Sequence, residues 1–391
     1  MNELILLPVL KAHLSTKSKL VMTKKYLEGA EEYAKHWQGK VTTLVELTDT
    51  PTTDMDHEEV DSGVTGTAVE VRPTNISDLA DRIKTAGAVL AFLGPYEEPT
   101  AKLCKKINVP LIFVSEYSLK TAYQIIETGT SNPILQLRRK FWAFNAERAN
   151  RRSLQYATAL QCSGTPTYEA YQGLIDDKLL FFDNRVYRED IISCGELEQK
   201  AEFLRQNKPL RLVYGGRLVA MKGVLDLIAV AAELRALDIP FSLDIVGRGP
   251  QEQSLKKLIS STGLNDIVSL HPPSDFRTGW VPLLKQKADV FVCCHPQGDP
   301  SSTYPEVMSC GLPICGYAND AFRGIVQHAK AGIATPLGDP RALAKEIAKL
   351  HLNRALLISN AKLAREFAIQ NSFEVTFARR ANQIIQNSRT H

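Results

Sequence analysis

The sequence lacks the features of membrane-spanning and secreted chains. No stretch approaches the roughly 20 uninterrupted apolar residues that cross a bilayer. The opening MNELILLPVLKAHLSTKSK does not show the succession of a basic region, an apolar region and small residues that is typical of a signal peptide. Aromatic residues make up 7% and charged residues 23% of the 391 residues, as in ordinary globular chains. The sequence therefore predicts a cytoplasmic protein that is long enough for two domains.

A disulfide or zinc framework is also missing. The seven cysteines are odd in number, include no C-x-x-C pair and lie mostly in apolar runs. We interpret them as reduced core residues and expect no metal site built from them. Charge is uneven: residues 1–205 hold 25 Lys and Arg against 28 Asp and Glu, a balance of −3, whereas 206–391 hold 22 against 15, or +7. The positive second part fits an anionic ligand, although a solvated surface would also explain it.

What is present after residue 205 is an alternation of short β-branched runs with helix-periodic segments. The runs that predict strands are 210–216, 241–247, 267–271, 288–294, 312–317 and 332–337. The segments between them carry apolar residues at spacings of three and four, so each helix should lay one face on the sheet. This pattern predicts a doubly wound α/β domain, whose ligands bind outside the carboxyl ends of the strands.

The first part of the chain follows the same rhythm and predicts a second doubly wound α/β domain. Its expected strands are 3–9, 40–47, 88–94, 109–116, 157–164 and 178–186. We therefore expect an N-terminal domain over 1–205, a C-terminal domain over 206–370, and a helix over 371–391 that crosses back to the first domain. A hinge is expected in 194–209.

Three stretches at predicted strand ends could bind an anion or a sugar. In GGRLVAMKG (215–223), Gly216 would let a ligand approach the backbone, and Arg217 and Lys222 suit a diphosphate; two solvated cations are the alternative. In VGRGP (246–250), the residues Gly247, Arg248, Gly249 and Pro250 form either a ligand loop or an ordinary tight turn. The third glycine of a dinucleotide fingerprint is absent there.

The third stretch is QGDPSSTYPEVMSCGLPI (297–314), which follows a predicted buried strand. Glu306 lies in the first turn of the next helix, where the helix dipole would stabilise its charge. A carboxylate at this place could instead accept hydrogen bonds from two adjacent hydroxyls of a sugar. The loop adds further polar groups through Asp299, Pro300, Ser301, Ser302 and Thr303.

Together, GGRLVAMKG, LDIVGRGP and QGDPSSTYPEVMSCGLPICGY resemble the retaining glycosyltransferases of the B-type fold (GT-B), family 4, over roughly 205–370. The resemblance implies two Rossmann-like domains facing a cleft. It also implies a nucleoside-diphosphate sugar as donor, with uridine as the expected base, and neither cofactor nor metal. The N-terminal domain would bind the acceptor, such as a glycan, a lipid-linked saccharide or another hydroxyl.

The resemblance also assigns roles to individual residues. Arg217 and Lys222 would bind the diphosphate beside Gly216, and Glu306 would bind the ribose hydroxyls. Asp299 and the loop through Thr303 would contact the donor sugar. The nucleobase pocket would be lined by Gly247, Arg248, Gly249, Pro250, His271 and Pro272.

The sequence departs from the family pattern in two places. The family has two glutamates separated by seven residues, but that spacing from Glu306 reaches Gly298, with Asp299 one position later. Where members often place an acceptor-facing histidine, this chain has Glu116 and Tyr117. His13, Glu116 and Tyr117 are therefore candidates for the acceptor side, with a surface histidine and a helix-capping carboxylate as the alternatives.

Two other stretches leave alternatives open. Asp54-Met55-Asp56 has the spacing of a metal-binding D-x-D, but it lies in an acidic loop and solvated charge explains it better. The segment 134–156 combines five arginines and a lysine with Phe141, Trp142 and Phe144. It predicts either peripheral contact with the cytoplasmic membrane face or a core helix with its aromatic residues against the sheet. No recognition fold accompanies this charge, so nucleic acid is not expected.

Two functions compete with glycosyl transfer. A sugar-nucleotide epimerase of the same fold would need acid and base residues around the hexose and no second substrate. A non-catalytic module that binds a nucleotide sugar would fit the displaced Asp299, whereas the intact Arg217, Lys222 and Glu306 argue against it.

Overall fold

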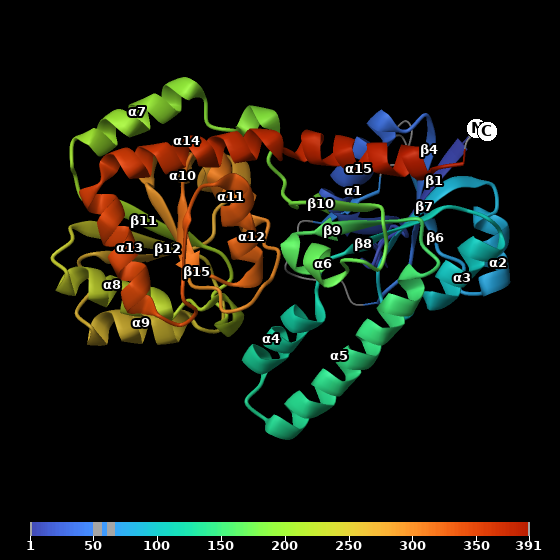
Figure 1. The fold of residues 1–391 in the computed structure, drawn as a ribbon, viewed down its shortest axis with the longest axis horizontal. Helices are drawn as coiled ribbons and strands as arrows, with labels where there is room; N and C mark the ends of the chain where they lie inside the picture. The colour runs from blue at the N-terminus through green and yellow to red at the C-terminus, as the bar shows by residue number, and fades with distance from the viewer. Residues whose placement is uncertain (1, 50–56, 61–66, 390–391) are drawn as a thin grey trace. The chain divides into compact units, whose positions relative to one another are not determined.

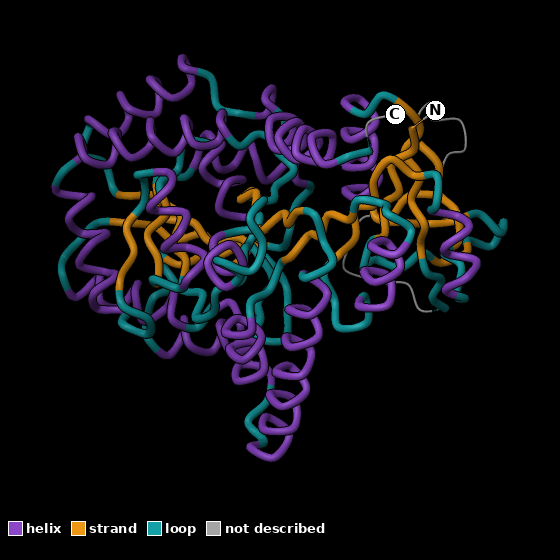
Figure 2. Tube along the Cα trace, turned by 45° about the vertical axis from the view of Figure 1, so that its right-hand side comes forward, coloured by secondary structure: helices purple, strands orange, loops and turns teal. Residues whose placement is uncertain are grey.

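The computed structural model describes residues 2–49, 57–60 and 67–389, which form two compact units (Figure 1). Unit 1 comprises Met1–Leu119, Lys140–Phe181 and Glu374–His391, and unit 2 comprises Lys120–Arg139 and Phe182–Phe373. Each unit contains a parallel sheet flanked by helices (Figure 2). The predicted fold class, two doubly wound α/β domains, is confirmed.

Unit 1 is built on a seven-stranded parallel sheet in the order β10-β9-β8-β7-β1-β4-β6. The same unit also contains a three-stranded antiparallel sheet, β2-β3-β5, which was not predicted. The elements are β1 Asn2–Leu7, β2 His13–Leu14, β3 Leu20–Thr23, α1 Lys24–His36, β4 Gly39–Val45, β5 His57–Glu59, β6 Thr67–Val71, α2 Ile76–Ile83, β7 Ala86–Phe92, α3 Glu98–Lys106, β8 Leu111–Ser115, β9 Ala159–Ser163, α6 Thr165–Ala170, β10 Lys178–Phe181 and α15 Phe373–Asn387.

Unit 2 is built on a six-stranded parallel sheet in the order β13-β12-β11-β14-β15-β16. Its elements are α7 Cys194–Arg205, β11 Leu210–Gly215, η2 Ala220–Lys222, α8 Asp226–Ala236, β12 Phe241–Val246, α9 Glu252–Ser261, β13 Val268–His271, η3 Phe276–Trp280, α10 Val281–Lys287, β14 Val290–Cys293, α11 Thr303–Ser309, β15 Ile314–Tyr317, α12 Asp320–Ala329, β16 Ile333–Thr335, α13 Pro340–Leu352 and α14 Arg354–Gln370, with the short η1 turn at Arg188–Asp190. Strand order reverses between β11 and β14, which is where such sheets bind ligands.

Two helices carry the chain across the division between the units. Helix α4 (Leu119–Gly129) belongs to unit 2 from Lys120 onward. Helix α5 (Pro133–Leu154) belongs to unit 2 as far as Arg139 and to unit 1 from Lys140. None of the helices in the described ranges combines the length and apolar character that crossing a bilayer requires.

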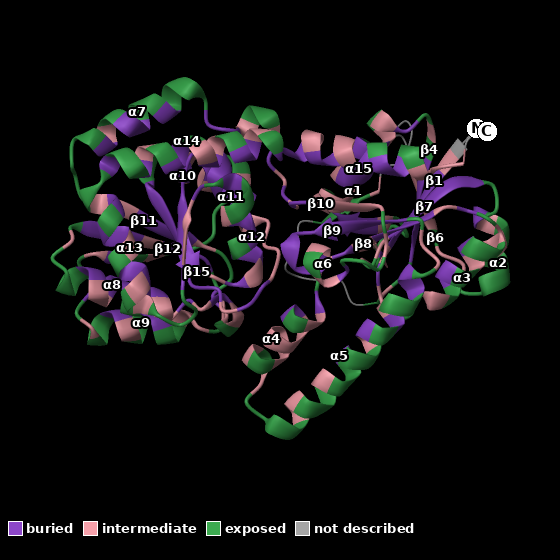
Figure 3. Cartoon of the chain, viewed as in Figure 1, coloured by how far each residue is buried: buried purple, intermediate pink, exposed green. Residues whose placement is uncertain are grey.

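The central strands of both sheets are buried along most of their length, and the buried faces of the helices complete the cores (Figure 3). In unit 2, Leu212, Val213 and Tyr214 of β11 are at most 1% exposed, because helices cover both faces of a parallel sheet. Six of the seven cysteines are buried and free, as predicted. Cys194 is free but exposed, at the first residue of helix α7.

The boundary between the two units does not coincide with the predicted domain boundary between residues 205 and 206. Helix α7 packs within unit 2, where Leu197 joins a buried cluster with Ile192 and Ala361. Buried Lys200 donates hydrogen bonds to the carbonyls of Leu284 (3.0 Å) and Cys310 (3.2 Å). These contacts explain why the division lies at Phe181 and Phe182 and not within the predicted hinge over 194–209.

The last helix, α15, belongs to unit 1 although it follows unit 2 in the sequence. The Arg380 guanidinium donates to the Gln161 side chain at 2.8 Å, and the Gln161 amide donates back to the Arg380 carbonyl at 3.0 Å. Arg389 donates to the carbonyls of Lys84, Ile107 and Asn108. These hydrogen bonds attach the C-terminal segment to β9 and to the ends of α2 and α3.

Buried Lys200 generates a prediction about the pH dependence of stability. Burial lowers the pKa of Lys200 to about 8, whereas an unfolded lysine has a pKa of about 10.4. Between these values the unfolded chain holds a proton that the folded chain has lost, so the free energy of unfolding rises with pH. Lys200→Met lacks this group. We therefore expect the free energy of unfolding of the wild type, relative to that of Lys200→Met, to rise by up to about 3 kcal/mol from pH 8 to 10.5 in denaturant titrations. A difference that stays flat over this range would contradict the prediction.

Candidate active site

The candidate site lies at the carboxyl ends of β11, β12 and β14, where the loops approach one another closely. A Cβ atom on Gly247 would lie 2.0 Å from the Gly216 carbonyl oxygen, and one on Gly249 would lie 2.5 Å from the Leu218 carbonyl oxygen. Backbone hydrogen bonds join the same loops: the amide of Leu218 donates to the Arg248 carbonyl at 2.8 Å. The glycines predicted from the sequence are therefore required by backbone packing, and this packing fixes the two loops against each other.

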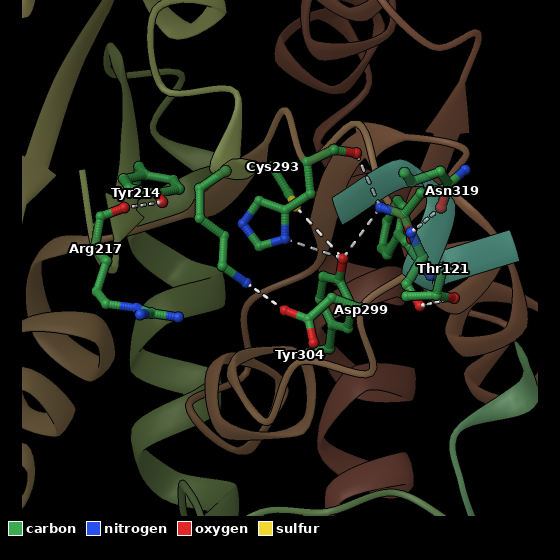
Figure 4. A network of polar contacts seen from close by, with 12 residues as sticks. Thr121, Tyr214, Arg217, Cys293, Asp299, Tyr304 and Asn319 are labelled. Carbon is green, nitrogen blue, oxygen red and sulfur yellow. Dashed lines mark hydrogen bonds and ion pairs between the residues drawn. The ribbon is translucent and has the colours of Figure 1, made fainter. Parts of the chain in front are cut away.

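Lys222 and Asp299, predicted from separate motifs, meet in this site. Lys222 ends the short turn η2, and Gly223 follows it in the left-handed region with φ of 59°. The ammonium of Lys222 lies 2.7 Å from the Asp299 carboxylate, and both side chains are largely buried. Because the pair spans the loops after β11 and β14, it joins the two sides of the strand-order reversal (Figure 4).

Arg217 lies on the same side of the site but stays unpaired. Its side chain is exposed, and within the part of the chain that the structure describes its guanidinium has no hydrogen-bond or ion-pair partner. Its carbonyl accepts a hydrogen bond from the Tyr214 hydroxyl at 3.4 Å, which holds the backbone of the loop (Figure 4). The guanidinium is therefore available for an anion.

Glu306 is buried in α11, with 5% of its surface exposed. Arg185 binds its carboxylate at 3.2 Å, and the Arg185 guanidinium stacks over the Phe276 ring at 3.9 Å from the centroid. Sequence reasoning missed Arg185, because it lies in the loop after β10, far from every motif. Its two partners place it where it can orient the carboxylate of Glu306.

A buried polar network supports the loop that carries Asp299. His295, directly after β14, has its pKa lowered well below the usual value by burial, so the ring is neutral. The Tyr304 hydroxyl lies 3.3 Å from its Nδ1, and the Asn319 amide donates to the His295 carbonyl at 3.0 Å (Figure 4). These residues were not predicted. Only His295 had a signal in the sequence, because it directly follows a predicted buried strand.

Helix α4 also contacts the loop that carries Asp299. The Gly298 amide donates to the Gln124 side chain at 2.9 Å, and Thr121 donates to the Gly298 carbonyl at 3.3 Å. Lys120 pairs with Asp320 at 2.7 Å. Both backbone groups of Gly298 are therefore held by α4, next to the residue that pairs with Lys222.

The residues predicted for the nucleobase lie at the ends of β12 and β13. The ring of His271 is engaged by Asp244, at 2.7 Å between Nε2 and Oδ1, so His271 is not free to contact a base through this nitrogen. Arg248, Pro250 and Pro272 are exposed. Gly247 brings these strand ends together, since its amide donates to the His271 carbonyl at 3.0 Å.

The loop residues Pro300, Ser301, Ser302 and Thr303 are half-buried and run from Asp299 into α11. The Ser301 amide donates to the Asp299 carbonyl at 2.8 Å, and the Glu306 amide donates to the Ser302 carbonyl at 3.2 Å. The turn thus joins Asp299 to Glu306 through consecutive backbone hydrogen bonds.

The acceptor-side candidates belong to unit 1. His13 lies in β2, where its ring packs edge-on against His57 at 5.4 Å between centroids. Glu116 and Tyr117 follow β8, and Tyr117 is 44% exposed. The D-x-D of Asp54 and Asp56 lies outside the described residues. Among the described residues, no group of three or more His, Cys, Asp or Glu side chains could hold a metal ion.

The packing of Gly247 generates a second prediction. Gly247→Ala places a methyl group 2.0 Å from a backbone oxygen, so the loops must separate. We expect the free energy of unfolding to fall by about 1 to 3 kcal/mol, measured by chemical denaturation. Gly94→Ala, which meets nothing within 4 Å, is the matched control and should leave stability nearly unchanged. Equal stability of the two variants would contradict the packing argument.

Comparison with known proteins shows a sequence similarity in the second part of the chain. Residues 196–368 match the family described as "Glycosyl transferases group 1". WcaL of Salmonella typhimurium, which carries the name of a colanic acid biosynthesis glycosyltransferase, is 26% identical over 46% of this chain and 45% of its own length. AmsK of Erwinia amylovora, an amylovoran biosynthesis glycosyltransferase, is 28% identical over 41% of this chain and 42% of its own. The match thus spans less than half the length of these curated relatives.

Solved structures extend the likeness of fold to nearly the whole chain. HepE of Anabaena, solved in complex with UDP, has a TM-score of 0.64 at 15% identity and covers 99% of this chain and 100% of its own. The sucrose-phosphate synthase of Thermosynechococcus elongatus has a TM-score of 0.63 at 15% identity, over 99% of this chain and 98% of its own. At this identity the likeness concerns the fold. Over residues 196–368 the chain is therefore similar to the group 1 glycosyl transferases, as its motifs predicted, and its two parallel sheets share the fold of these solved structures.

Proposed function

We propose that the protein transfers a sugar from a nucleoside-diphosphate sugar to an acceptor hydroxyl, with retention of configuration at the anomeric carbon. The observation that carries this proposal is the pairing of Lys222 with Asp299, at 2.7 Å, where the strand order of unit 2 reverses. This pair lies where doubly wound sheets bind nucleotides. A cation for phosphate and an anion for sugar hydroxyls lie side by side there.

The diphosphate of the donor would bind Arg217 and Lys222. The free guanidinium of Arg217 can engage two phosphate oxygens at once, whereas the ammonium of Lys222 acts as a point charge. Before the donor binds, Asp299 holds Lys222 in place and compensates its charge. The diphosphate would take over Lys222, and the freed carboxylate of Asp299 would accept hydrogen bonds from the donor sugar.

Glu306 would bind the ribose of the donor. Its carboxylate can accept hydrogen bonds from two vicinal hydroxyls, and Arg185 fixes its orientation from the other side. HepE, which shares the fold, was solved with UDP bound. HepE was also solved with UDP-glucose. Together with the family resemblance, these complexes support uridine as the base of the donor and a hexosyl group as the sugar.

Catalysis would rest on electrostatic stabilisation of the leaving group. As the bond between the sugar and the diphosphate breaks, negative charge gathers on the phosphate oxygens and positive charge on the anomeric carbon. Arg217 and Lys222 would stabilise the first charge, and Asp299 would face the sugar that carries the second. The acceptor oxygen would form the new bond on the same face and pass its proton to the departing phosphate oxygen, which yields the glycoside and the free nucleoside diphosphate without a metal ion.

The acceptor would be a glycan, a lipid-linked saccharide or another hydroxyl compound bound mainly by unit 1. The names of WcaL and AmsK refer to the biosynthesis of colanic acid and of amylovoran by those proteins. A saccharide acceptor fits this relationship. His13, Glu116 and Tyr117 remain the proposed contacts, and a cytoplasmic location remains an expectation from the sequence.

Nucleotide binding tests the donor site directly. We expect UDP or a UDP-sugar, at 100 times its dissociation constant, to stabilise the protein by about 2.7 kcal/mol in a thermal melt. GDP and ADP should stabilise it less. Lys222→Ala should abolish the shift, whereas Lys345→Ala, which removes an exposed lysine of α13, should keep it. If no nucleotide shifts the melting curve of the wild type, the proposed donor site is wrong.

Turnover tests the catalytic role of Lys222. Removal of a preorganised charge partner costs about 3 kcal/mol of barrier, so Lys222→Ala should lower kcat at least about 100-fold in a radiolabelled sugar-transfer assay. Circular dichroism should show that the variant is folded. Wild-type activity should survive EDTA, since the proposal needs no metal. Normal transfer by folded Lys222→Ala would remove this role, and loss of activity in EDTA would refute metal independence.

A further inference from the structure

Helix α5 presents a continuous apolar stripe to solvent. Ile134, Leu137, Phe141 and Phe144 follow each other at spacings of three, four and three, which places them on one face of the helix. With Trp142 beside them, these side chains are between 43% and 80% exposed. Figure 3 colours most of α5 as exposed or intermediate. We call these five residues the apolar stripe.

The exposure of the stripe overturns one of the two interpretations made from the sequence. A core helix would bury its aromatic residues against the sheet, but the buried face of α5 consists of small and polar residues. These are Ala143, Glu147, Ala149 and Ser153, followed by Leu154 at the end of the helix. Among the described residues, every Phe or Trp side chain that is exposed belongs to the stripe. The aromatic residues of α5 therefore do not contribute to the core.

The charge beside the stripe is of one sign. Between 133 and 154 the sequence has five arginines and one lysine against a single glutamate. This Glu147 is buried, where it accepts hydrogen bonds from Arg151 at 2.7 Å and from the Tyr171 hydroxyl at 3.0 Å. The only acidic group of the helix is therefore paired with Arg151 and does not offset the charge of Arg138, Arg139 and Arg148.

The exposed arginines lie along the stripe itself. Arg138 and Arg148 are exposed on the turns that carry Leu137 and Phe144, and the Arg148 guanidinium lies 6.0 Å from the centre of the Phe144 ring. Such an arrangement lets the apolar groups enter an apolar layer while the guanidinium groups stay at its polar edge. The stripe from Ile134 to Phe144 is about 15 Å long, long enough to lie in a membrane interface and too short to span one.

We propose that the apolar stripe docks the protein on an anionic lipid surface, with α5 lying in the interfacial plane. Anionic headgroups would pair with Arg138, Arg139 and Arg148, and the aromatic rings would enter the boundary of the acyl chains. A second copy of the chain fits this face poorly, since a symmetric dimer would place the same arginines against each other. The inference does not depend on the donor site or on the reaction proposed for it.

The test is flotation of the full chain with lipid vesicles. We expect binding to phosphatidylcholine vesicles that contain roughly 30% phosphatidylglycerol, and weak binding to phosphatidylcholine alone. Raising salt from about 0.1 to about 0.5 M should reduce binding, because the headgroup contacts are screened. Failure to bind the anionic vesicles at low salt would overturn the proposal, and so would equal binding to both vesicle types.

Variants then assign the binding to α5. Leu137→Ser with Phe141→Ser should lower the partition coefficient at least about tenfold, because two apolar anchors are lost. The matched control is Tyr96→Ser with Leu352→Ser, which removes two side chains that are each 79% exposed elsewhere. For charge, Arg138→Gln with Arg148→Gln should weaken binding to anionic vesicles about tenfold, whereas Arg341→Gln should have little effect.

Two further readouts separate this proposal from its alternatives. Melting temperatures and the UDP-dependent shift should be the same in the α5 variants and the wild type, because the changed side chains are exposed and remote in sequence from the donor-site motifs. If the α5 variants bind vesicles like the wild type, the stripe is not the docking surface. If sedimentation velocity instead shows a dimer that Leu137→Ser with Phe141→Ser dissociates, a second copy covers the stripe and the membrane proposal is wrong.

Discussion

The close approach of the loops after β11 and β12 is the constraint on which the candidate site depends. Where glycine Cβ atoms would lie 2.0 to 2.5 Å from carbonyl oxygens, only a residue without a side chain fits. This packing fixes the backbone of Arg217 and directs η2 so that Lys222 reaches the loop after β14. The pair of Lys222 and Asp299 thus depends on a backbone arrangement that the glycines permit.

Much of this site could be predicted because its signals are local. Strand ends, glycines and cations follow one another within a few residues in GGRLVAMKG and VGRGP, and the order of strands then brings the loops together. Arg185 and Gln124 could not be predicted. Each contacts the site across more than 100 residues of sequence, and neither occurs in a motif. Pairings of this kind follow from tertiary packing, which a single sequence does not reveal.

The division into units also depends on tertiary packing that a single sequence does not reveal. The sequence correctly predicted α7 as a helix, but helical periodicity does not specify the sheet on which a helix packs. Lys200 and Leu197 attach α7 to unit 2 through contacts with residues up to 164 positions away. Helix α5 shows the converse: its sequence left a membrane-contacting helix and a core helix both open, and only the exposure of its aromatic residues distinguished a surface helix from a buried one.

The pairing of Lys222 with Asp299 also sets how selective the site is among anions. A site with an uncompensated lysine would attract inorganic phosphate and other small anions that are abundant in cells. Here any anion must first compete with the carboxylate of Asp299, which already contacts the ammonium of Lys222 at 2.7 Å. A ligand that offers only one phosphate would gain little by that exchange. The proposed diphosphate donor would engage Arg217 at the same time, and its sugar would give Asp299 new hydrogen-bond donors. In the proposed reaction the internal ion pair would thus discriminate in favour of the complete donor, and it would re-form when the nucleotide product leaves.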